Sequence, residues 1–157
     1  MANSAAMCTS FKTQLLKGSH AFGAQATNSV RTVTTKDTFN LALYYATATL
    51  NDTTQKYSAT GEVSDASYTA KGKLLTNATE PNATGTTAFW TPSANVTWTA
   101  LTSGGAFDCA FLMNNKSTDT TELGVAVFTF SSQTITAADF TLTMPTNDAT
   151  TGLIRIA

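Results

Sequence analysis

Short segments in which apolar and polar residues alternate recur from residue 38 to the C-terminus, and they constrain the fold more than any other feature. Alternation with a period of two places every second side chain on the same side of an extended strand. Polar turns separate the segments, at intervals of about 8 to 15 residues that are typical of sandwiches and barrels. The pattern therefore predicts an all-β single domain, either a β-sandwich or a barrel.

The most regular of these segments lies in the C-terminal half. Phe107, Cys109, Phe111 and Met113 form one face of a predicted strand, and the residues between them make the other face nearly as apolar. A strand that is apolar on both faces is typical of the centre of a sheet. Further strands are predicted around residues 39–45, 89–90, 96–99, 123–130, 140–144 and 153–156.

Residues 4–17 are predicted to form the one α-helix, with Asn3 or Ser4 at its N-cap. Three apolar residues recur at intervals of four and make a stripe along it: Met7, Phe11 and Leu15. Gly18 follows, at the position where helix ends favour a left-handed residue. The stripe fits a helix that packs on its own sheet, and it also fits an arm that docks on a neighbouring subunit.

The domain organisation follows from a change in composition after this helix. Residues 18–36 are rich in Gly, Ala, Ser and Thr without a long periodic pattern, which predicts an extended arm or a long loop. We therefore expect an N-terminal helix and arm over residues 1–36 and a β-sandwich or barrel over residues 37–157. A chain of 157 residues can bury enough surface to fold without disulfides or metals. Cys8 and Cys109 are accordingly predicted to be reduced, small hydrophobic residues.

The surface of such a domain should be nearly uncharged. About one residue in five is Thr, and charged residues make up 12% of the chain, roughly half the usual fraction. Faces of this kind repel each other little, which suits dense packing in an assembly. The net charge of −1 and the scattered Lys and Arg residues argue against nucleic acid as a partner. No apolar run reaches the length of a membrane span or a signal peptide, so we expect no membrane partner and assembly in a cytoplasm.

No residue pattern predicts catalysis. The single histidine, His20, lies among small residues with no acid close in sequence, and we expect it to be a solvated or hydrogen-bonded loop residue. Asp119 and Glu122 share a loop but lack the ligand-dense spacing of a calcium site. We therefore expect no enzyme activity, no catalytic residues, no cofactor and no metal.

Several apolar side chains are candidates for an interface. Phe89 and Trp90 precede Pro92 in a predicted short or edge strand, and Phe22 lies in the predicted arm. Trp90 and Trp98 fit core packing, and they also fit the sugar-stacking platform of a carbohydrate-binding module. The candidate interface residues are Met7, Phe11, Leu15, Phe22, Phe89 and Trp90.

A series of short motifs, in this order, resembles a family of small virion structural proteins of tailed bacteriophages. The motifs are Met1-Ala-Asn3, Phe11-Lys12, Leu15-Leu-Lys-Gly18, Asp37-Thr-Phe-Asn-Leu-Ala-Leu-Tyr44, Tyr57-Ser-Ala-Thr-Gly-Glu-Val-Ser64, Tyr68-Thr-Ala70, Val96-Thr-Trp-Thr99, Asp139-Phe-Thr-Leu-Thr-Met-Pro145 and Leu153-Ile-Arg-Ile-Ala157. The resemblance covers most of residues 37–157 and is weaker over residues 18–36. The chain departs from the family pattern over residues 103–113 and at Ser131-Ser132, where the family has an Ala-Leu-Ile-Tyr-like strand and a turn Gly.

The resemblance implies a function in the phage particle. It implies a capsid decoration, or cement, protein that binds the outside of the assembled head shell and stabilises it, with the major capsid protein and copies of itself, typically in a homotrimer, as partners. It would then be located on the capsid surface of the virion. The alternatives are a neck, tail or head-fibre protein of the virion, or a glycan-binding β-sandwich module.

Overall fold

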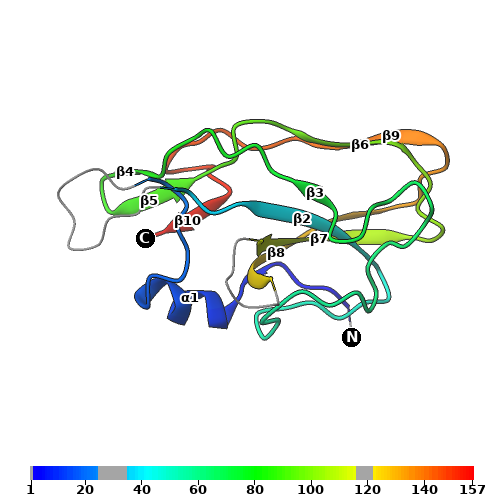
Figure 1. The fold of residues 1–157 in the computed structure, drawn as a ribbon, viewed down its shortest axis with the longest axis horizontal. Coiled ribbons are helices and arrows are strands. Elements are labelled where there is room, and N and C mark those ends of the chain that lie inside the picture. The colour runs from blue at the N-terminus through cyan, green and yellow to red at the C-terminus, as the bar shows by residue number, and fades with distance from the viewer. Residues whose placement is uncertain (1, 25–34, 116–121) are drawn as a thin grey trace.

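The computed structural model of the protein describes residues 2–24, 35–115 and 122–157 (Figure 1). The fold is all-β with one short helix in a single domain, as the alternating segments predict. The largest sheet contains five antiparallel strands in the order β1-β8-β7-β2-β3. Their bounds are β1 (Ala6–Met7), β2 (Phe39–Tyr45), β3 (Lys73–Leu74), β7 (Phe107–Asn114) and β8 (Leu123–Gln133).

The predicted central strand is the middle strand of this sheet. In β7, seven of the eight residues are buried and the other, Asp108, is half-buried. Its neighbour β2 is also buried on both faces, although the alternation in the sequence predicts only one apolar face there. The reason is that Asn40 and Tyr44 satisfy their polar groups within the protein: Asn40 Nδ2 donates to the Lys71 carbonyl, and the Tyr44 hydroxyl donates to the Ser58 carbonyl.

Two smaller sheets complete the fold. One pairs β6 (Val96–Leu101) with β9 (Ala138–Leu142), and the other has the order β10-β5-β4, with bounds β4 (Asn82–Thr84), β5 (Thr87–Trp90) and β10 (Ile154–Ile156). Figure 1 shows β6 and β9 at the top of the view, nearer to β2 and β3 than to β8. The Phe140 ring on β9 packs edge-on against the Phe107 ring on β7, with centroids 4.9 Å apart, so aromatic side chains fill the space between the layers.

The helix is shorter than predicted, because the chain before it joins the sheet. Helix α1 spans Thr9–Leu16, whereas the sequence predicts residues 4–17. Ala6 and Met7 form β1 and pair with β8, so tertiary hydrogen bonds take up this backbone. Asn3 caps no helix: its side chain donates to the Tyr45 carbonyl and to the Asp108 carboxylate. Gly18 has a φ of 66°, which confirms the predicted left-handed residue after the helix.

The N-terminal segment shares the core of the β domain. Cys8 and Phe11 are completely buried in the same apolar cluster as the strands of the large sheet. The burial of Phe11 confirms the interpretation in which the helix packs on its own sheet. Cys8 and Cys109 are both buried and unpaired, as predicted.

The polar segment between Thr76 and Thr87 is only partly a loop. It contains β4, which forms a hairpin with β5 through a turn at Gly85, where φ is 60°. This hairpin places the Phe89–Trp90 pair next to the C-terminal strand β10. The hairpin and β10 together form one wall of an apolar groove.

Candidate functional site

This apolar groove of about 190 Å³, the α1–β5 groove, is the clearest candidate binding site. Its lining residues come from α1, the segment after it, the β4–β5 hairpin and β10. They are Phe11, Leu15, Phe22, Pro81, Ala88, Phe89, Trp90, Ile154 and Ile156. Five of the six interface residues predicted from the sequence line this groove. The sixth, Met7, does not: it lies in β1 at the edge of the large sheet.

The aromatic residues of the groove form its floor. Phe11 is 0% and Trp90 is 2% exposed, whereas Ile156 at the rim is 46% exposed. The Phe22 ring stacks on Phe39 at 4.4 Å between centroids and meets the Trp90 ring edge-on at 4.8 Å. A partner would therefore touch the rim residues first and would meet the aromatic floor beneath them.

Hydrogen bonds hold this floor in place. Trp90 Nε1 donates to the Asn77 side-chain oxygen at 3.0 Å, and Asn77 Nδ2 donates to the Phe22 carbonyl at 3.1 Å. The side chain of Asn77 thus links the Trp90 ring to the backbone of the segment that carries Phe22. Trp90 and Trp98 are both buried, which confirms core packing for the two rings rather than a sugar-stacking platform.

A second cluster, the His20 clasp, lies next to the groove and consists of His20, Gln14, Asp37 and Asn114. His20 Nε2 is 2.8 Å from Gln14 Oε1, and His20 Nδ1 is 3.0 Å from Asn114 Nδ2. Asn114 Nδ2 and the backbone N–H of Ala21 both donate to Asp37 Oδ2, at 2.7 Å each. Burial lowers the pKa of His20 to about 4, against the opposing effect of the Asp37 carboxylate. The predicted hydrogen-bonded histidine is confirmed, and the acid beside it comes from a different part of the chain.

A third cluster surrounds a buried acid, Glu62, that is not among the residues predicted from the sequence. Glu62 is 5% exposed and accepts hydrogen bonds from the Tyr57 hydroxyl at 2.5 Å, the Tyr68 hydroxyl at 3.1 Å and the Lys71 backbone N–H at 2.7 Å. Burial raises the pKa of Glu62, although the three donors and the Lys71 charge oppose this. Lys71 Nζ forms an ion pair with Glu122. No motif in the sequence distinguishes Glu62 from an exposed glutamate, since its donors come together only through the fold.

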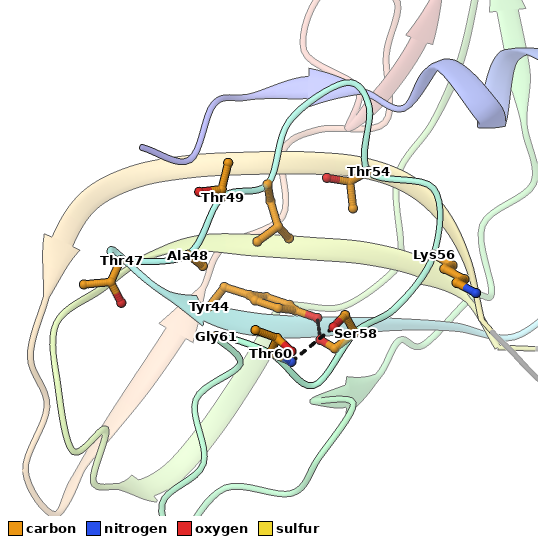
Figure 2. Close-up of a pocket in the computed structure, with 10 residues that line it drawn as sticks. Tyr44, Thr47, Ala48, Thr49, Thr54, Lys56, Ser58, Thr60 and Gly61 are labelled. Carbon is orange, nitrogen blue, oxygen red and sulfur yellow. Dashed lines mark hydrogen bonds between the residues drawn. The ribbon is translucent and has the colours of Figure 1, made fainter. Parts of the chain in front are cut away.

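A hollow of about 560 Å³, to which threonine contributes the most side chains, lies beside this cluster (Figure 2). Its lining residues are Tyr44, Thr47, Ala48, Thr49, Leu50, Thr54, Lys56, Ser58, Thr60 and Gly61. Figure 2 shows the Tyr44 side chain reaching Ser58, whose carbonyl accepts the Tyr44 hydroxyl at 2.6 Å. Because Tyr44 is almost completely buried, its ring has no open face for stacking, and the lining contains no carboxylate that could act as a general acid or base.

The part of the chain that the structure describes contains no group of three or more His, Cys, Asp or Glu residues placed to hold a metal ion. Within those same residues, no helix is both long and apolar enough to cross a membrane. Asp119 lies outside the described residues, so the predicted absence of a calcium site in its loop stays a prediction. Comparison of the chain with protein-family models, with curated proteins and with solved structures finds no match.

Proposed function

We propose that the protein is a bacteriophage capsid decoration protein that binds the outside of the assembled head shell and stabilises it. The observation that supports this most is the α1–β5 groove, which gathers five residues that the sequence marks as interface candidates. The resemblance to small phage virion proteins and the low content of charged residues point the same way. Copies of the chain itself, in a homotrimer, and the major capsid protein are the proposed partners.

The groove fits an apolar segment of the major capsid protein. Its lining side chains are all uncharged, and Leu15 and Ile156 lie partly open to solvent. Burying such surface contributes about 25 cal/mol per Å². A protein that binds the assembled shell and not its separate subunits shifts the assembly equilibrium toward the shell by mass action. Stabilisation of the shell then needs no enzymatic step.

The copy number of the protein in purified virions tests this proposal first. We expect a ratio to the major capsid protein near one to one, or a simple fraction that is set by the lattice of the shell. Quantitative gel densitometry or mass spectrometry of purified particles measures it. A ratio of a few per cent would instead assign the protein to the neck, the tail or a head fibre. Absence from particles would favour the alternative function, a glycan-binding module.

Ile156→Glu should strongly weaken binding to shells that lack the protein. The substitution places a charge at the rim of the apolar groove, where binding would have to remove it from water. We expect binding to weaken by at least about 30-fold, which corresponds to about 2 kcal/mol. Co-sedimentation of the purified variant with such shells measures the loss.

Leu74→Glu is the matched control for this experiment. Leu74 is 61% exposed and lies on β3, at the edge of the large sheet and outside the groove lining. The same substitution there should leave shell binding within about twofold of wild type, because surface changes outside an interface are close to neutral. Equal losses for the two variants would argue against docking through the groove.

A further inference from the structure

Residues 20–22 join four parts of the fold at one point. The His20 ring lies edge-on against Phe11 of α1, with centroids 4.9 Å apart, and it contacts Asn114 at the end of β7. The Ala21 N–H is bound by Asp37, just before β2. Phe22 then enters the floor of the α1–β5 groove. The position of Phe22 in the groove therefore depends on how His20 and Ala21 are held.

The hydrogen bonds around His20 require a neutral imidazole. Asn114 Nδ2 is a donor, so His20 Nδ1 must accept and Nε2 must carry the hydrogen that it donates to Gln14 Oε1. The Asn114 amide is held in this orientation because Nδ2 also donates to Asp37 Oδ2. Turning the amide over would place its oxygen against that carboxylate. A protonated imidazole would thus point an N–H at an amide N–H₂ group, with no acceptor between them.

The charged side chains on the surrounding elements do not remove this conflict. Asp37 is the acid in the clasp, and its Oδ2 already accepts two hydrogen bonds at 2.7 Å. On α1 and directly after it, Lys12 and Lys17 are cations, which do not favour a positive imidazole. The remaining charged groups on these elements are engaged elsewhere: Lys36 with Glu80, and Asp108 with Asn3.

We propose that the His20 clasp is an acid-sensitive latch: protonation of His20 releases residues 20–22 and displaces Phe22 from the floor of the α1–β5 groove. In the neutral state the clasp holds the groove in its binding form. In acid the imidazolium favours the released state, in which water and the Asp37 carboxylate are open to it. The expectation that low pH also weakens docking on the shell rests on the proposed function. The release of residues 20–22 does not depend on that function.

The expected size of the effect follows from the difference between the two states. The pKa of His20 is about 4 in the clasp, whereas a solvated histidine titrates near 6.5. By linkage, the ratio of released to clasped protein should rise roughly twentyfold between pH 7 and pH 5. The partial exposure of His20 reduces this figure, so we expect a rise of at least about fivefold.

NMR of the isolated full-length protein tests the latch directly. Because the chain contains one histidine, its ring signals report on His20 without any assignment by mutation. We expect a midpoint well below 6.5, together with a change in the Trp90 indole N–H signal that follows the same titration. A midpoint near 6.5, or a Trp90 signal that stays constant while His20 titrates, would overturn the proposal.

Two variants separate the latch from a general effect of acid. His20→Gln keeps a side chain that can accept from Asn114 but cannot be protonated, so its Trp90 signal should not move between pH 7 and pH 5. Asn114→Asp replaces the donor that faces His20 by a carboxyl group, which also lies against Asp37, and the added negative charge should raise the His20 midpoint by about one unit or more. If either variant titrates as wild type does, the hydrogen bonds between His20 and Asn114 are not the cause of the acid response.

Shell binding at pH 7 and pH 5 then tests the consequence for docking. We expect the binding of wild type in co-sedimentation to fall between these values by no more than the rise in the released-to-clasped ratio, and that of His20→Gln to stay unchanged. Equal losses for both proteins would contradict control of the groove by the latch. Failure of wild type to bind at pH 7 would contradict the proposed function and leave the NMR result to decide on the latch.

Discussion

Gly72→Ala is expected to destabilise the protein more than any other single-methyl change, by about 3–5 kcal/mol. Gly72 has a φ of 65°, in the left-handed region that disfavours a Cβ. A Cβ there would also lie 2.0 Å from the Leu41 carbonyl oxygen and 2.6 Å from the Ala42 Cα. Both atoms belong to the backbone of β2, which is held between β7 and β3 and has little room to move. Urea unfolding followed by tryptophan fluorescence measures the loss.

Gly85→Ala separates the two causes of this loss. Gly85 has nearly the same φ, 60°, but no atom lies within 4 Å of the position that a Cβ would take. The strain of the left-handed backbone is then the main cost, and we expect a loss of about 1 kcal/mol. Similar losses for the two variants would show that backbone strain dominates and that β2 gives way to the added methyl group.

Glu62→Ala is expected to lower the free energy of unfolding by about 3–5 kcal/mol, because it removes a buried acceptor from three donors, one of them buried and two partly buried. Two of these are the hydroxyls of Tyr57 and Tyr68, and the third is the Lys71 backbone N–H. The Tyr68 hydroxyl in turn accepts from the backbone N–H of Leu43 in β2. Loss of Glu62 should therefore loosen the long segment between β2 and β3. Urea unfolding at pH 7 measures the change.

Glu122→Ala is the matched control, since Glu122 belongs to the same cluster but pairs with the partly exposed side chain of Lys71. We expect a loss of about 1 kcal/mol or less.

Glu62→Gln tests the direction in which the stability depends on pH. The pKa of Glu62 is raised in the folded state, so the folded protein binds the proton more tightly and loses stability relative to the variant as the pH rises above about 4.5. A stability difference that does not change with pH would contradict the raised pKa.

Local patterns predict the strands well where neighbouring side chains alone decide burial. In β6, Val96 and Trp98 are buried while Thr97 and Thr99 are exposed, as the alternation predicts. The start of the helix is predicted wrongly, because Ala6 and Met7 find hydrogen-bond partners in β8, more than 100 residues away. Pairing over such a distance leaves no signal in a local periodicity.

The candidate site, too, could be predicted from the sequence only in part. Apolar character at a chain end and beside a proline suffices to mark Phe11, Leu15, Phe22, Phe89 and Trp90 as a group. The fact that they line one groove depends on the pairing of β10 with β5, which the sequence does not reveal. Polar clusters are harder still to predict, since the environment of Glu62 or His20 depends on donors that come from distant segments.

The two buried thiols can report separately on local and on global opening of this protein. Burial raises the pKa of Cys8 to about 11 and that of Cys109 to about 12, so neither sulfur reacts with alkylating reagents while it is covered. Cys8 lies between β1 and α1, whereas Cys109 lies in the middle strand of the large sheet. The rate of Cys8 modification therefore reports detachment of the N-terminal segment, and that of Cys109 reports unfolding of the whole domain.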